Sequence, residues 1–173
     1  MRKLFAILLI AATLWIGFGC TGNSRTLKEI GAELNLNLLS GTIVIEEDSH
    51  SGFHGDGRSF IAIQFADDEL VSQLALSDNW FSLDETAQAL LYGYRDEENG
   101  NTRQYGPYIV DEAGQARFPQ MQNGYYWLTD RQSGNEKDGK TTDWSILLQP
   151  SLNFTIAVYD LDANILYYAK MDT

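Results

Sequence analysis

The sequence is poor in the residues that most often cross-link a protein or carry its chemistry. Its 173 residues include a single cysteine, Cys20, and two histidines, His50 and His54. A lone cysteine excludes disulfides within the chain, so the folded part must be stabilised by its apolar core. There is no G-x-S-x-G motif, and both histidines lie in one short segment. Nucleophilic catalysis by a serine or cysteine triad therefore finds little support.

Basic residues are scarce as well. The sequence has 12 Lys and Arg residues against 24 Asp and Glu residues, which gives a formal net charge of −12. A surface of this kind repels phosphates and anionic lipid headgroups. We therefore expect no nucleic-acid partner, and we expect the acidic surface to serve solubility or a cationic partner.

Aromatic residues, in contrast, are abundant. They make up 12% of the chain, and each buried ring removes roughly 150–250 Å² of surface from water. This content is enough to build a core without disulfides, and the length indicates one domain of about 150 residues behind a short leader.

The leader is the clearest pattern in the chain. Arg2 and Lys3 precede an apolar run over residues 4–18, and Gly17 and Gly19 lead to Cys20. A permanent span normally needs about 20 apolar residues. A positively charged N-terminal region, a shorter apolar run and small residues before the cleavage site are typical of a cleavable export signal.

The residues around the cysteine narrow the kind of signal. Residues 16–20 read Ile-Gly-Phe-Gly-Cys, and this segment resembles a bacterial lipobox. The resemblance implies that residues 1–19 are removed, that Cys20 is lipidated, and that residues 20–26 tether the domain to the outer side of the cytoplasmic or outer membrane. An uncleaved membrane anchor is the alternative.

Beyond residue 26, apolar periodicity predicts a single α+β domain over 27–173. We expect mainly one antiparallel sheet of about six to eight strands, with two or three helices packed on one face. Helices are predicted over 27–39, 67–76 and 84–91. Strands are predicted over 42–46, 58–65, 105–110, 115–118, 124–131, 144–148, 153–160 and 165–171.

The segment with both histidines is the first candidate site. Asp48, His50, His54 and Asp56 lie within ten residues, and imidazole with carboxylate is a common ligand set for transition metals. Glycines in the segment favour a loop, which removes the helical reason for the H-x3-H spacing. We therefore predict a solvated loop and keep these four residues as weak metal candidates. A pH-sensitive contact is the other alternative, since histidine titrates near neutrality.

Two further patterns are weaker. Residues 160–164 match the start of a calcium loop, but Ile165 and Met171 stand where Gly and Glu belong, so a hairpin turn is predicted. Residues 132–143 are polar and are predicted to form a solvated loop. The aromatic residues Tyr125, Trp127 and Tyr168 are predicted to lie in the core, with an exposed stacking platform as the alternative.

No pattern identifies a reaction. The sequence predicts a membrane-anchored exported lipoprotein that acts as a binding or interaction module, without catalysis or cofactor. Its expected partners are the membrane, through Cys20, and an envelope protein. An accessory subunit of an envelope complex and a carboxylate-based envelope hydrolase are the alternatives.

Overall fold

The computed structural model describes residues 20–50, 56–98, 101–132 and 144–173. By its contacts the chain divides into two compact units, Met1–Gly41 and Thr42–Thr173. The sequence predicted one domain over 27–173, and that boundary stays a prediction. Among the described residues, no helix has the length and apolar character needed to cross a membrane.

The first unit contains helix α2, Cys20–Leu34. The helix was predicted over 27–39, but it begins at Cys20 and includes the residues expected as a tether. Leu27, Ile30 and Leu34 are buried and share one helical stripe. The chain leaves the helix at Asn35, which has φ of 55°, and the N–H of Leu36 donates to the carbonyl of Gly31 at 2.8 Å. A side chain at Gly31 would come within 2.6 Å of the Leu36 oxygen.

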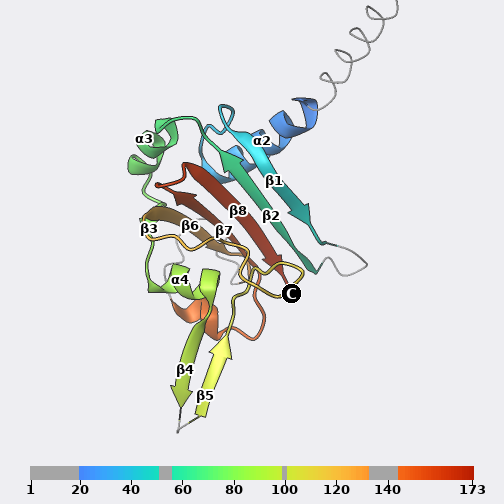
Figure 1. The fold of residues 1–173 in the computed structure, drawn as a ribbon, viewed down its shortest axis with the longest axis vertical. Coiled ribbons are helices and arrows are strands. Elements are labelled where there is room, and N and C mark those ends of the chain that lie inside the picture. Colours follow the sequence, from blue (N-terminus) through green and yellow to red (C-terminus); the bar gives the residue numbers. More distant parts are fainter. Residues whose placement is uncertain (1–19, 51–55, 99–100, 133–143) are drawn as a thin grey trace, which may run out of the picture. The chain divides into compact units, whose positions relative to one another are not determined.

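The second unit is built on a six-stranded antiparallel sheet with the order β1-β2-β8-β7-β6-β3 (Figure 1). The strands are β1 Thr42–Asp48, β2 Gly57–Gln64, β3 Phe81–Ser82, β6 Gly124–Asp130, β7 Phe154–Asp160 and β8 Ile165–Asp172. The last strand in the chain lies inside the sheet, paired with β2 on one side and with β7 on the other. The predicted α+β class with mainly one antiparallel sheet is confirmed.

The sheet has one strongly apolar face. Phe60 and Ala62 of β2 lie on it beside Tyr167 and Ala169 of β8, and the rings of Phe60 and Tyr167 lie 5.9 Å apart. Helix α4, Glu85–Tyr92, covers this face with Ala87, Leu90 and Leu91. Because residues two apart in a strand share a face, alternation along each strand selects these side chains for the core.

The two helices of this unit begin close to where acidic residues predicted them. Helix α3 spans Glu69–Ala75 and buries Leu70 and Leu74, but Leu76 is 88% exposed because it lies past the helix end. At α4, the side chain of Asp84 accepts a hydrogen bond from the Ala87 N–H at 2.9 Å. A side-chain cap of this kind stabilises a helix by about 1 kcal/mol.

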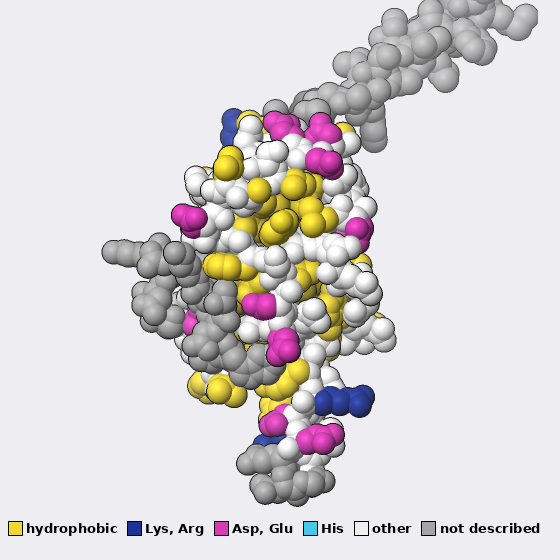
Figure 2. Space-filling model, turned by 90° about the vertical axis from the view of Figure 1, so that its left-hand side faces the viewer, with side chains coloured by type: hydrophobic (Ala, Val, Ile, Leu, Met, Phe, Trp, Pro, Cys, Tyr) yellow, Lys and Arg dark blue, Asp and Glu magenta, His cyan; other side chains and the backbone are white. Residues whose placement is uncertain are grey.

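A second, two-stranded sheet pairs β4, Tyr94–Glu98, with β5, Asn101–Tyr105. The rings of Tyr94 and Tyr105 stack at its base with centroids 5.0 Å apart. This hairpin projects away from the main sheet (Figure 1), and basic and acidic side chains lie together on it (Figure 2).

Three strand predictions were wrong: those over 105–110, 115–118 and 144–148. The strand predicted over 105–110 ends at Tyr105, because Pro107 has no N–H to donate to a neighbouring strand. Past it, only an isolated bridge joins Val110 to Ala116. Residues Trp144–Leu148, predicted as a strand, form the 3₁₀ helix η1. A short continuous apolar run does not distinguish a strand from a buried helical turn.

Candidate functional site

The candidate site is a pocket at the end of the β1–β2 hairpin. It has a volume of about 640 Å³, within the range of roughly 300–1,000 Å³ typical of small-molecule sites. The hairpin lines it with Glu47, Asp48, Ser49, Arg58, Ser59 and Phe60. A later segment of the chain lines it with Ile109, Val110, Asp111, Glu112 and Arg117.

The hairpin wall is held by backbone pairing that continues past β1. The N–H of Ser49 donates to the carbonyl of Arg58 at 2.8 Å, and the Ser49 hydroxyl also accepts from the Arg58 N–H at 3.0 Å. Glu47 and Phe60 are direct partners in the register, so both side chains stand on the same face of the sheet. The pocket therefore has a fixed wall in which charge adjoins an aromatic ring.

Arg117 joins the two walls. Its Nη2 and Nε atoms donate to the two carboxylate oxygens of Glu47 at 2.6 and 2.9 Å. Its guanidinium carbon lies 4.8 Å from the centroid of the Phe60 ring. This hydrogen bonding lowers the pKa of the Glu47 carboxyl and raises that of Arg117. A bidentate Arg–carboxylate pair, with the guanidinium stacked on an aromatic ring, holds both side chains more firmly than a single hydrogen bond would.

A tight turn supplies the acidic wall. Oδ1 of Asp111 accepts hydrogen bonds from the N–H groups of Ala113 and Gln115, both at 2.9 Å, and Gly114 completes the turn with φ of 77°. The neighbouring Glu112 is exposed. The turn thus holds two carboxylates at the pocket, and within the described residues neither takes part in an ion pair.

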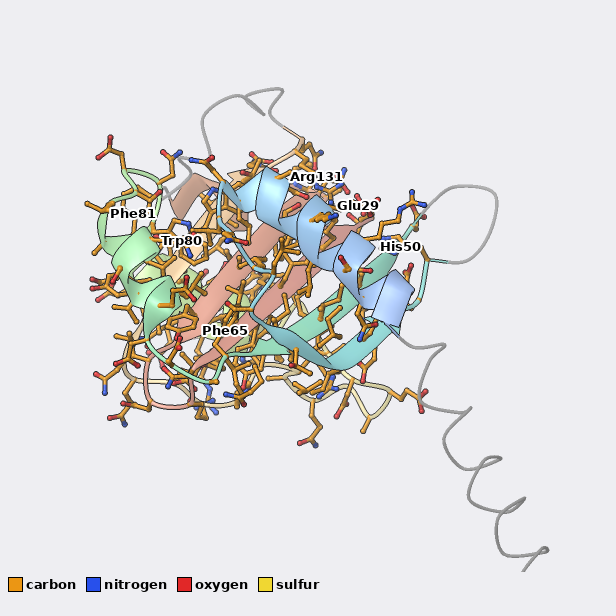
Figure 3. The ribbon with its side chains drawn as sticks, turned by 90° about the horizontal axis from the view of Figure 1, so that it is seen from above. Glu29, His50, Phe65, Trp80, Phe81 and Arg131 are labelled. Carbon is orange, nitrogen blue, oxygen red and sulfur yellow. The ribbon has the colours of Figure 1, made fainter. Side chains whose placement is uncertain are left out.

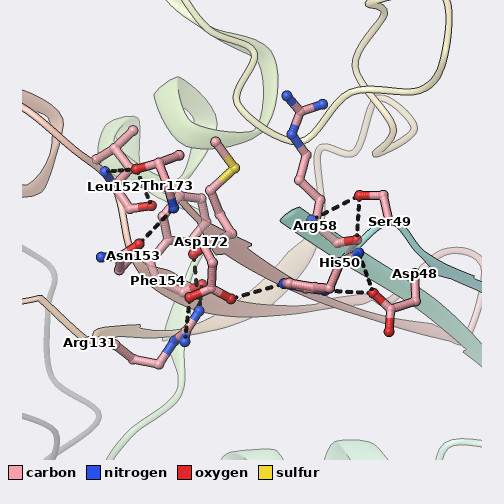
Figure 4. Close-up of polar contacts among 11 residues, drawn as sticks. Asp48, Ser49, His50, Arg58, Arg131, Leu152, Asn153, Phe154, Asp172 and Thr173 are labelled. Carbon is pink, nitrogen blue, oxygen red and sulfur yellow. Dashed lines mark hydrogen bonds and ion pairs between the residues drawn. The ribbon is translucent and has the colours of Figure 1, made fainter. Parts of the chain in front are cut away.

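Arg58 lies at the pocket with its charge uncompensated. Its backbone is hydrogen-bonded to Ser49, and Figure 4 marks no hydrogen bond or ion pair at its guanidinium among the residues drawn. Within the part of the chain that the structure describes, Arg58 has no ion-pair partner. Its side chain is half-buried, so the charge is partly removed from water at the edge of the pocket.

His50 lies next to this pocket and binds two carboxylates (Figure 4). Its Nδ1 is 2.6 Å from Oδ1 of Asp48, and its Nε2 is 3.0 Å from Oδ2 of Asp172 at the end of β8. Asp172 in turn pairs with Nη1 of Arg131 at 2.8 Å. Figure 3 marks His50 after β1 and Arg131 after β6. Four charged groups therefore tie together strands that are far apart in the sequence.

The four linked charged groups shift one another's pKa values. Hydrogen bonding to Asp48 raises the pKa of His50. The backbone and ring of His50 lower the pKa of the Asp48 carboxyl. Burial alone would raise the pKa of Asp172, but hydrogen bonds from Arg131 and His50 hold it below its ordinary value. The physical effect in each case is stabilisation of the charged form by a partner.

The metal candidates have different outcomes. Asp48 and His50 are brought together as an ion pair, and the same imidazole also contacts the carboxylate of Asp172. Asp56 is exposed, and His54 lies outside the described residues. Within the ranges that the structure describes, no three His, Cys, Asp or Glu side chains are placed to hold a metal ion. Cys20 begins helix α2, but its side chain is not among those described.

The other candidates belong to the scaffold. Trp127 and Tyr168 are buried, as the core prediction required, while Tyr125 is half-buried. Oδ1 of Asp160 accepts from the N–H groups of Asp162 and Ala163 at 2.9 and 3.1 Å, which confirms a hairpin turn at the calcium-like segment.

Comparison with known proteins adds no relative: no family model, no curated protein and no solved structure matches this chain. The pocket itself is therefore the basis for inferring a function. Sequence reasoning did not find Arg58, Phe60, Asp111 or Arg117. A β1–β2 hairpin was predicted, but no spacing signal relates it to the turn near residue 111.

Proposed function

We propose that this chain is an exported lipoprotein, anchored through Cys20, whose folded part is a binding module with its site at the pocket beside Arg58. The anchor is supported by the leader over residues 1–19, which lies outside the described residues, and by its lipobox-like end. The binding role is carried by one observation. A pocket of small-molecule size has a structured wall of charged groups around an aromatic ring.

The state of the carboxyl groups favours binding over hydrolysis. A carboxylate-based hydrolase needs a general acid whose pKa is raised toward neutrality. The Glu47 carboxyl, which stands on the Phe60 face of the hairpin at the pocket, has a lowered pKa because Arg117 stabilises its charged form. A carboxyl group held in this way stays ionised and is a poor proton donor.

The anchor is tested by acylation in a bacterial host that expresses the full chain. Radiolabelled palmitate should enter the wild type and a Ser24→Ala control, and it should not enter Cys20→Ser. The wild type should fractionate with the membrane. Label in the Cys20→Ser variant, or a wild-type protein in the cytosol with Met1 intact, would contradict the anchor.

The binding role is tested by a measurement that does not require the ligand to be identified first. Native mass spectrometry of the full chain, extracted from the envelope in mild detergent, should show a bound small molecule. Arg58→Glu reverses a charge at the pocket and should remove that mass. Arg103→Glu makes the same change on the exposed strand β5 and should retain it. A wild type without a bound mass, or equal retention by both variants, would exclude the pocket as the site.

A further inference from the structure

The charge pattern of the pocket defines the class of ligand. We infer that the pocket beside Arg58 binds a small molecule with one carboxylate and two cationic groups: a basic amino acid or the end of a basic peptide. This inference rests on the proposed binding function and makes it specific. It follows from the charges left over in the lining, from their placement and from the size of the space.

Most of the charge in the lining is already compensated. Glu47 is held at both oxygens by Arg117, and Asp48 is bound by the ring and the backbone N–H of His50. Among the described residues these pairs leave Arg58, Asp111 and Glu112 without an ion-pair partner, and Asp111 lies near enough to Arg117 to raise the pKa of that guanidinium. A ligand with one anionic and two cationic groups complements this remainder.

The leftover charges come from different elements. Arg58 belongs to β2, and the two carboxylates belong to the turn that starts at Asp111. The turn hydrogen bonds occupy only Oδ1 of Asp111, so its Oδ2 remains available. A ligand carboxylate would bind Arg58, and the ligand's ammonium and side-chain cation would bind the turn. Opposite charges placed on separate walls also fix the ligand's orientation.

The pocket already stabilises a guanidinium of its own. Arg117 lies over the Phe60 ring and against a carboxylate, which shows that the local surroundings suit such a cation. The chain's net charge of −12 also attracts cations from a distance. A dianion would meet repulsion from Asp111 and Glu112, and a neutral zwitterion would leave one carboxylate unmatched.

The size of the pocket fits the same class. At about 640 Å³ it is much larger than a metal ion or a phosphate needs, and it has room for an extended side chain in addition to an amino acid's α-groups. Uncompensated carboxylates on one wall and Arg58 on the other make an apolar ligand a poor match, because its binding would desolvate charges without pairing them.

The test is isothermal titration of the full chain in detergent micelles at low salt. L-arginine and L-lysine should bind. Agmatine, which is arginine without its carboxylate, should bind with an affinity at least about tenfold lower. L-glutamate and L-leucine should not bind. A tetrapeptide ending in Lys-Arg, whose last two residues carry one carboxylate and two cationic groups, is titrated in parallel and distinguishes a peptide end from a free amino acid as the source.

Two variants assign the contacts. Arg58→Gln should weaken L-arginine about tenfold and leave agmatine unchanged, because agmatine lacks the group that Arg58 binds. Glu112→Gln should weaken both. Arg103→Gln and Glu97→Gln, the same changes on the projecting hairpin, should alter neither.

The outcomes separate this inference from the proposed function. If L-arginine and L-lysine fail to bind the wild type, or bind Arg58→Gln and Glu112→Gln as tightly as they bind the wild type, the inference is wrong. If L-glutamate or L-leucine binds instead and Arg58→Gln abolishes it, the ligand class is wrong and the binding pocket stands. The pocket as a binding site fails only if the native mass spectra show no mass that depends on Arg58.

Discussion

The hydroxyl of Tyr126 on β6 donates a hydrogen bond of 2.6 Å to Oδ2 of Asp84, and the other oxygen of that carboxylate caps helix α4. One side chain thus serves both the sheet and the helix that covers it. Burial, followed by the bond to Asp84, raises the pKa of the Tyr126 hydroxyl. The pair sets the position of α4 on the apolar face of the sheet.

Tyr126→Phe removes the hydroxyl and keeps the ring in the core. We expect the free energy of unfolding to fall by about 1.5–3 kcal/mol, the usual contribution of a hydrogen bond to a charged group. Urea unfolding of the full chain measures it. Tyr125→Phe, at the next position of the strand, is the control and should change the value by less than about 0.5 kcal/mol. Equal effects would mean that Asp84 does not use this bond.

A pH dependence follows from the chain of charges at His50. The pKa of His50 is raised from its ordinary value of 6.5 by hydrogen bonding to Asp48. Its contribution to stability is therefore complete below that ordinary value and is lost as pH rises through the raised one. The lowered pKa values of Asp48 and Asp172 act at the other end. Their contribution is present above about pH 4 and is lost as pH falls through the lowered values.

The chain's only other histidine is the matched control for this effect. Melting temperature measured between about pH 6 and 9 should fall with rising pH in the wild type and in His54→Gln, and the slope should flatten in His50→Gln. A slope that disappears with His54→Gln, and persists without the imidazole of His50, would contradict the assignment.

Alanine substitutions at two glycines distinguish the stability cost of a positive φ from that of steric crowding. Gly93 and Gly114 both have positive φ, at 80° and 77°. A Cβ at Gly93 would come within 2.4 Å of the Tyr105 oxygen, whereas one at Gly114 would meet nothing within 4 Å. Gly114→Ala should therefore destabilise by about 1 kcal/mol. Gly93→Ala should cost more, because the hairpin must also move. Equal losses in urea unfolding would show that the base of the β4–β5 hairpin yields to the added methyl group.

The Arg117–Glu47 pair depends on guanidinium geometry as well as on charge. Arg117→Lys keeps the charge but loses one of the two hydrogen bonds and the flat stacking on Phe60, so we expect a loss of about 1 kcal/mol in the free energy of unfolding. Arg25→Lys is the control, because Arg25 and Glu29 are paired at 2.7 Å but are 83% and 63% exposed. That change should leave the free energy of unfolding unchanged within the error of the measurement.

The hairpins were predictable from the sequence because they are local. Alternating apolar residues and polar turns identified the pairs 42–46 with 58–65 and 153–160 with 165–171, and the register confirms both. The pairing of β2 with β8 was not predictable, since it joins Phe60 to Ala169 and no local pattern encodes so long a separation. The candidate site was not predictable for the same reason, since Glu47 and Arg117, which join its two walls, are 70 residues apart.

The position of β8 also affects how the molecule forms. Because β8 lies between β2 and β7, the β1–β2 hairpin has no neighbour on its inner side until residues 165–172 have been synthesised or translocated. Until then the β1–β2 hairpin has an unpaired strand edge at β2. The large sequence separation between β2 and β8 makes assembly of the sheet slow. For the export that we propose, slow assembly is favourable, because a secretion channel accepts an unfolded chain.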